Sequence, residues 1–242
     1  MRDSCVTYTL GRALYVALTN RCNAVPLAMT RGPQFVMPAS SGFAPLPEGF
    51  EPTADDVVAA VQARLSSGGD GGPSSVVFAG LGEPLLRLGV LLDAAHRLDA
   101  AHSGTLAIRV SSNGLVERER SVEVARALHA AGVRAATIAI ASADEAQHRA
   151  LLDPRAAAAR SLADSDDEAP PAPGACAPPS CSAAATAPGL GEACAFVRAL
   201  VVAGVQVECT AVAQPAVDLA AAAALAQSLG ASFRERSWHG QD

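Results

Sequence analysis

The stretch TLAIRVSSN, from Thr105 to Asn113, alternates between two kinds of side chain, and this alternation decides the expected fold. One face of the stretch carries Leu106, Ile108 and Val110, which are all apolar. Its odd-numbered side chains are mostly polar: Thr105, Ala107, Arg109, Ser111 and Asn113. Successive side chains of a strand point to opposite faces, whereas a parallel strand buried between two helix layers is apolar on both. The stretch therefore predicts a barrel wall, apolar outward against helices and polar inward toward a wet cavity.

The segment Val205–Val212 repeats this alternation. Its apolar face carries Val205, Val207, Cys209 and Ala211, and its other face carries Gln206, Glu208 and Thr210. Arg109 and Glu208 would then both face inward. An unpaired charge there would be costly, so we expect either a structural ion pair across the barrel, which is the simpler interpretation, or contacts to a substrate.

The rest of the chain alternates predicted strands with predicted helices. The expected strands are Ala13–Leu18, Ser75–Ala79, Thr105–Ser111, Ala135–Ala141, Val205–Val212 and Ser232–Arg236. The expected helices are Thr53–Leu65, Leu86–Ala101, Ser121–Ala131, Asp144–Leu152, Glu192–Ala203 and Ala216–Leu229. Such alternation is typical of parallel βαβ units. An open doubly wound sheet fits the count too, but the alternation within the strands favours an α/β fold with a partial (βα)6 TIM-like barrel of parallel strands.

Composition narrows the class of protein. The 242 residues are half apolar, which suits one domain spanning residues 1–242. The net charge of −6 argues against non-specific nucleic-acid binding. We find neither an apolar run of about 20 residues, the length that spans a bilayer, nor a secretory signal at the N-terminus. We therefore expect no membrane partner and a soluble cytoplasmic protein with reduced thiols.

Residues 155–191 interrupt the alternation. This segment contains DSDDEAPPAPGACAPPS and has too few large apolar side chains to offset the entropy of ordering the chain. We expect a disordered insertion that could contact a protein partner. Its cysteines, Cys176 and Cys181, are spaced as C-x4-C with Cys194 further on, and this spacing matches no strong cluster or zinc pattern.

A glycine-rich turn, AGLGEP from Ala79 to Pro84, follows the second expected strand. A dinucleotide-binding turn would need a third glycine at position 85, which is leucine. Glu83 would also place negative charge where a pyrophosphate must lie. A carboxylate at the end of a strand can instead bind an amino group, and the alternative is a plain turn with a solvated glutamate.

Polar side chains also follow two other strands. Ser111 and Asn113 fall at the carboxyl end of the third expected strand, where barrel sites are built, and suit a sugar hydroxyl. The Asn113–Gly114 pair is also typical of a turn, which does not exclude a ligand contact. Cys22 lies in LTNRCNAVPLAM, Leu18 to Met29, just after the first expected strand, so we expect it at the same mouth.

These stretches together resemble the radical SAM superfamily, and more specifically the radical SAM proteins associated with TatD-type deoxyribonucleases. The resemblance rests on ALYVALTNRCN, EPTADDVVAAV, VVFAGLGEPLLRLGVLLDAA, RVSSNGL and VECTAVAQPAVDLAAAAALAQSLGASFRER. It implies a partial (βα)6 barrel. It also implies that Gly82, Glu83 and Pro84 lie near the amino group of S-adenosylmethionine, Ser111 and Asn113 near its ribose, and Cys22 at a [4Fe–4S] cluster.

The cluster motif of that family, Cys-x3-Cys-x2-Cys, is incomplete in this sequence. Starting from Cys22, it requires cysteines at positions that hold Pro26 and Met29. A [4Fe–4S] cluster needs a thiolate on each iron that the protein holds; proline offers no side-chain ligand and a thioether is a weak one. One thiolate in this loop cannot hold the cluster. The expectation is therefore a superfamily member of unknown substrate that binds S-adenosylmethionine. It is either an enzyme with an unusually assembled cluster or a catalytically silent protein; a scaffold for partners is the alternative.

Overall fold

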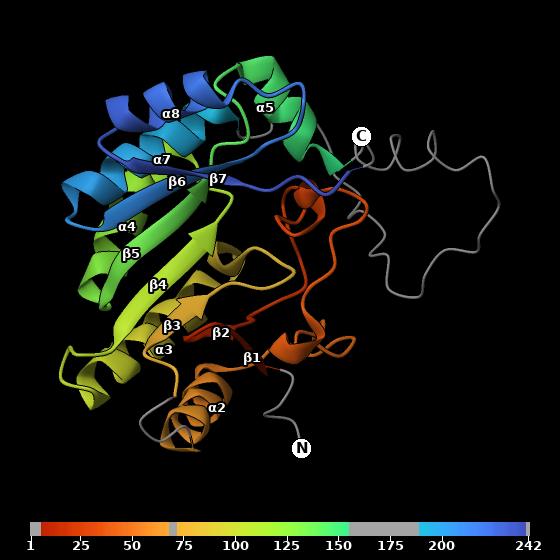
Figure 1. Cartoon of the computed structure of the whole chain (residues 1–242). Helices are drawn as coiled ribbons and strands as arrows, with labels where there is room; N and C mark the ends of the chain where they lie inside the picture. Colours follow the sequence, from red (N-terminus) through yellow and green to blue (C-terminus); the bar gives the residue numbers. More distant parts are fainter. Residues whose placement is uncertain (1–5, 68–71, 155–188, 241–242) are drawn as a thin grey trace.

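The computed structural model describes residues 6–67, 72–154 and 189–240, and its core is one open seven-stranded sheet (Figure 1). The strands are β1 (Thr7–Leu10), β2 (Ala13–Val16), β3 (Ser75–Phe78), β4 (Ala107–Ser112), β5 (Val133–Ala139), β6 (Gln206–Val212) and β7 (Ser232–Arg236). Their order in the sheet is their order in the chain. From β2 to β7 all neighbours are parallel, which confirms the expected α/β class.

The first strand is a correction to the sequence analysis, which expected six parallel strands. β1 pairs antiparallel with β2 through the turn at Gly11 and Arg12, and Gly11 has a φ of 59°. The segment TYTL-GR-ALYV has a hairpin pattern, two β-rich runs separated by two residues that include glycine. The sheet therefore begins with a short antiparallel edge strand.

The helices fall close to the predicted ranges. They are α2 (Ala54–Ser67), α3 (Leu88–Ala101), α4 (Ser121–Ala130), α5 (Glu145–Leu152), α7 (Leu190–Val202) and α8 (Leu219–Ser228), with short 3-10 turns η1 (Met29–Arg31), η2 (Ala39–Ser41), η4 (Pro84–Arg87) and η5 (Arg118–Arg120). Thr53 caps α2, since its hydroxyl accepts a hydrogen bond from the Asp56 backbone N–H. Asp218 caps α8, which is why that helix begins after the predicted Ala216.

The expected insertion ends earlier than predicted. Gly189 caps α7, and Leu190 and Gly191 form its first turn, so these residues belong to a helix. Glu192 accepts a hydrogen bond from the Gly189 backbone N–H at 2.8 Å, which fixes this helix start. Residues 155–188, with Cys176 and Cys181, lie outside the described residues.

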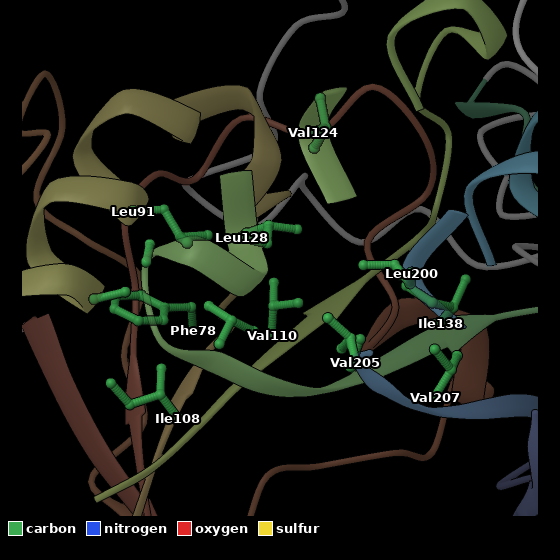
Figure 2. Packing of buried hydrophobic residues seen from close by; sticks show 14 of the residues in the cluster. Phe78, Leu91, Ile108, Val110, Val124, Leu128, Ile138, Leu200, Val205 and Val207 are labelled. Carbon is green, nitrogen blue, oxygen red and sulfur yellow. The ribbon is translucent and has the colours of Figure 1, made fainter. Parts of the chain in front are cut away.

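The core lies between the sheet and the layer of helices α2, α3, α4, α7 and α8 (Figures 1 and 2). Strand residues Ile108, Val110, Val207 and Cys209 all belong to this core. Figure 2 shows Ile108 and Val110 packed near Leu91 and Leu128 of the helices. The predicted apolar face of each strand is therefore the face that contacts helices.

The opposite face of the sheet meets the long connection between β2 and α2 (Figure 1). Tyr8 and Tyr15 stack on this face with ring centroids 5.1 Å apart, and Phe43 of the connection packs edge-on against Tyr8. The segment after β7 also binds the connection, because His239 donates its N–H to the Arg31 carbonyl at 2.8 Å. The connection and the segment after β7 thus meet across the face of the sheet that lies opposite the helix layer, near the carboxyl ends of the strands. Among the described residues, no helix has the length and apolar character needed to cross a bilayer.

Candidate functional site

Three of the predicted site residues meet at the carboxyl edge of the sheet. Cys22 follows β2, Glu83 follows β3 and Asn113 follows β4. The Asn113 backbone N–H donates to Glu83 Oε2 at 2.8 Å, and Asn113 Nδ2 lies 3.8 Å from Cys22 Sγ. The structure therefore brings together groups that are separated by 91 residues in the sequence.

Gly82 holds the loops after β2 and β3 against each other. Its N–H donates to the Thr19 carbonyl at 3.2 Å, and the next N–H, of Glu83, donates to the Arg21 carbonyl at 2.9 Å. A Cβ atom on Gly82 would overlap the carbonyl oxygens of Thr19 and Arg21. The glycine is thus explained by backbone contact between two loops. Pro84 follows as the buried first residue of η4.

Glu83 is buried and its oxygens accept hydrogen bonds from neutral groups. Besides the Asn113 N–H, the Leu85 N–H donates to Oε1 at 3.0 Å. Burial raises the pKa of the Glu83 carboxyl to about 7, although hydrogen bonds from Asn113, Leu85 and Ser112 favour its ionised form. None of the ion pairs among the described residues involves Glu83. The site thus has a buried carboxylate that lacks a cation.

Cys22 is a protonated thiol at neutral pH. Burial raises its pKa to about 11, and the negative charge of Glu83 acts in the same direction. Hydrogen bonds from the Ala24 backbone and the Asn113 amide offset only part of this effect. Because the thiolate is the reactive form, Cys22 is a poor nucleophile in this setting.

Asn113 forms the predicted turn and also lines the site. Its Oδ1 accepts a hydrogen bond from the Leu115 N–H at 3.0 Å, and Gly114 has a φ of 74°. Its Nδ2 donates to Asn23 Oδ1 at 2.7 Å, which ties the loops after β4 and β2 together. Ser111 lies two residues earlier, is half-buried and is paired in register with Thr137.

Glu51 is a positioning residue that the sequence analysis did not identify. Its Oε1 accepts from the Thr19 hydroxyl at 2.6 Å and from Arg21 Nε at 2.9 Å, and its Oε2 accepts from Arg87 Nη1 at 2.7 Å. This carboxylate therefore joins the loop after β2 to η4 after β3. The only signal in the sequence was EPTADDVV, where Glu51 comes just before the N-cap of α2.

The donor set does not fit a [4Fe–4S] cluster. Pro26 and Met29 stand where thiolates are required, the Met29 N–H donates to the Pro26 carbonyl, and the Met29 residue is 65% exposed. Cys194 and Cys209 lie in the core beneath the helices. In the described ranges no group of three histidine, cysteine or acidic side chains can hold a metal ion.

The polar face of the sheet departs from one expectation. Glu208 forms its ion pair with Arg234 of β7 at 2.6 Å, and Arg109 donates through Nη2 to the Thr137 hydroxyl at 2.9 Å. The predicted ion pair between Arg109 and Glu208 is therefore wrong. Arg109 is nevertheless close enough to Glu208 to help lower its pKa. Glu208 lies on β6, and among the described residues no hydrogen bond or ion pair joins it to Cys22, Glu83 or Asn113.

No protein-family model and no curated protein matches this chain. Its function is therefore argued from the residues of the site.

Proposed function

We propose that the chain is a partial (βα)6 barrel of the radical SAM type that binds S-adenosylmethionine at the carboxyl edge of its sheet without carrying out radical chemistry. The observation that carries this proposal is Glu83, a buried carboxyl group that forms no ion pair with any described residue. A buried charge is stabilised when an opposite charge enters beside it. The ammonium group of the methionine moiety supplies such a charge.

The arrangement of strands supports the barrel part of the proposal. The strands follow one another in the sheet in chain order, as in (βα) barrels. Tyr15 of β2 lies close enough to Arg234 and Arg236 of β7 to influence their pKa values when it is ionised, although these strands lie near opposite edges of the sheet. Such proximity requires strong curvature about the polar face.

The roles proposed for the site residues follow from their chemistry. Glu83 would pair with the ammonium group, while the Ser111 hydroxyl and the Asn113 amide would offer hydrogen bonds to the ribose. Gly82 and Pro84 would shape the turn that presents Glu83. The Asn113 amide already bonds Asn23, so its contact with a ribose would use the remaining donor and acceptor capacity of the amide.

The chemistry of the bound cofactor is the second part of the proposal. Reductive cleavage of S-adenosylmethionine needs an electron from a cluster, and one protonated thiol at Cys22 does not provide the ligands for it. We derive no radical step. The protein would instead use the bound cofactor as a ligand.

A calorimetric titration tests the site. S-adenosylmethionine and 5′-methylthioadenosine share the adenosine and the sulfur, but only the first has an ammonium group. We expect Glu83→Gln to weaken binding of S-adenosylmethionine by about tenfold or more, the worth of a charged hydrogen bond, and to leave 5′-methylthioadenosine nearly unchanged. Glu123→Gln, an exposed position on α4, is the matched control with the same charge change.

Anaerobic reconstitution with iron and sulfide tests the chemistry. The proposal expects no stoichiometric iron per chain and no cleavage of the cofactor. A stoichiometric cluster with cleavage would contradict it and restore a radical SAM enzyme. If neither iron nor S-adenosylmethionine binds, the alternative of a scaffold protein replaces the proposal.

A further inference from the structure

Arginine side chains gather on the polar face of the sheet around one carboxylate. Arg109 comes from β4, Arg234 and Arg236 from β7, and Arg31 from η1. The hydrogen bond from Arg234 is the main cause that lowers the pKa of Glu208, and Arg109 and Arg236 add to it. Burial lowers the pKa of Arg236, and the charges of Arg234 and Arg31 lower it further. Glu208 and the four arginines are therefore each close enough to another member of this group to influence its pKa.

The charges in this arginine cluster, defined as Arg31, Arg109, Arg234 and Arg236, do not balance. Among the described residues, Arg109, Arg234 and Arg236 act on one carboxylate, Glu208, and the fourth guanidinium group, Arg31, acts on Arg236, in a chain whose net charge is −6. The Nε atoms of Arg109 and Arg236 are buried and have no hydrogen-bond partner within the part of the chain that the structure describes. Buried donors without acceptors and like charges at close range both raise the free energy of the folded chain. An incoming anion would relieve both.

The cluster can be reached from solvent. The side chain of Arg234 is 50% exposed, and β7 is the edge strand of the sheet. Arg236 also lines a cavity of about 20 Å³ beside Thr210 and Gln214, enough for one water-sized group. A larger group would enter from the side of Arg234.

The side chain of Arg31, the fourth arginine of the cluster, is held in place by contacts with Phe35 and His239. Its guanidinium stacks on Phe35 at 4.3 Å from the ring centroid, and its Nη2 contacts His239 Nε2 at 3.2 Å. The same arginine is linked by its backbone to the segment after β7. Its Nε also donates to the Ser237 carbonyl at 3.4 Å, and none of the ion pairs among the described residues involves Arg31, so its positive charge is available to a ligand.

We propose that the arginine cluster binds the oxyanion group, phosphate or carboxylate, of a small molecule. Guanidinium groups match both groups because they present parallel N–H donors to paired oxygens. The proposal does not depend on S-adenosylmethionine, since it concerns the strand face that bears Glu208 rather than the turn of Glu83.

Calorimetric titrations with inorganic phosphate and with malonate at constant ionic strength test the proposal. We expect saturable binding of one anion per chain, and the tighter of the two probes identifies the class. Arg236→Gln should weaken this binding about tenfold or more, since it removes charged donors. Arg126→Gln, an exposed arginine on α4, is the matched control and should leave the affinity unchanged.

A second variant separates a binding role from a structural one. Glu208→Gln removes the competing carboxylate and frees Arg234, so the anion should bind more tightly. Arg236→Gln should leave the unliganded protein at least as stable as wild type, because it removes a partly buried charge for which burial and the charges of Arg234 and Arg31 outweigh the attraction of Glu208. The proposal is overturned if neither probe binds saturably up to about 10 mM, if Arg236→Gln and Arg126→Gln have equal effects, or if Glu208→Gln weakens binding.

Discussion

Two glutamates near the carboxyl edge show how partners decide the state of a carboxylate. Burial opposes ionisation at Glu51, but Arg21, Thr19 and Arg87 outweigh it and lower its pKa. At Glu83 the partners are neutral amides and a hydroxyl, and the net effect of its burial is a pKa of about 7. Glu51 is therefore a structural carboxylate. Glu83, which is buried among neutral partners and has a raised pKa, has the properties of a carboxyl group at a ligand site.

The raised pKa of Glu83 predicts a specific dependence of stability on pH. Its folded pKa lies above the unfolded value, so the folded state holds the proton more strongly, and its contribution to stability falls as pH rises from about 4.5 to about 7. The shift corresponds to about 3 kcal/mol. We expect wild type to lose this amount relative to Glu83→Gln when urea unfolding is compared at pH 4.5 and pH 7.5. Equal changes in the two proteins would contradict the assignment.

His148 predicts the opposite dependence. It is fully buried in α5, and among the described residues neither ring nitrogen has a hydrogen-bond partner of normal geometry, although the Ser142 backbone lies close enough to favour the protonated ring. Burial lowers its pKa to about 4, so the neutral ring stabilises the fold above about pH 6.5 and this contribution is lost as pH falls toward 4. Acidification over this range should cost wild type about 3 kcal/mol more than His148→Leu. Chemical unfolding at pH 7 and pH 4 measures the difference, and parallel losses would refute it.

At the scale of elements, the site depends on contact between two loops. Gly82→Ala should destabilise the protein by about 1–3 kcal/mol, the usual cost of overpacking, because the new Cβ meets backbone oxygens that cannot move aside independently. Gly89→Ala is the matched control: Gly89 lies in α3 with open space around it, so the change should stabilise by about 0.5–1 kcal/mol. Urea unfolding measures both, and a stable Gly82→Ala variant would contradict the described contact.

The sequence could predict elements whose pattern is local. Alternation in Thr105–Asn113 identified the face of β4 that meets helices, and Thr53 and Asp144 identified two helix starts. The hairpin of β1 has a local signal too, but its strands have four residues each and no long apolar run. The early start of α7 was obscured by the composition of the residues before it.

The candidate site divides in the same way. Cys22, Glu83 and Asn113 were predicted to lie close together because each follows a strand, and the carboxyl ends of parallel strands meet at one edge. Glu51 could not be found by this argument, since it follows no strand and acts through Arg21 and Arg87. The arginine cluster joins residues from η1, β4 and β7, and only the curvature of the sheet brings them within reach.

For the whole molecule, the polar side of the sheet is covered by the connection between β2 and α2 and by the segment after β7. The connection after β2 meets the segment after β7 where Gln34 donates to the His239 carbonyl at 3.0 Å. Gly32 lies beside this contact with a φ of 104°, and a Cβ there would be 2.6 Å from the His239 carbonyl carbon. The polar face is thereby bridged at its carboxyl edge, while the edge strand β7 leaves Arg234 half exposed.

The whole-molecule stability profile combines the two buried groups. Between about pH 4.5 and 6.5 the contribution of Glu83 falls as pH rises and that of His148 increases, by similar amounts. We expect the free energy of unfolding of wild type to change little over this range. In Glu83→Gln it should rise with pH because only His148 still contributes, and in His148→Leu it should fall with pH because only Glu83 does. Urea titrations of all three proteins check this, and a steep wild-type profile would show that another group dominates.

The proposed pairing of Glu83 with the ammonium group of S-adenosylmethionine is tested by the affinity of wild type for this molecule at pH 6 and pH 8. Calorimetry in the absence of iron measures this affinity. Because the pKa of Glu83 is about 7, its carboxyl is mostly protonated at pH 6 and mostly ionised at pH 8. We expect one site per chain, with binding several-fold tighter at pH 8, because ionisation of Glu83 outweighs the partial loss of the ligand's ammonium charge, and with release of the Glu83 proton on binding at pH 6. Absence of binding at both pH values, or an affinity that does not change with pH, would contradict this pairing.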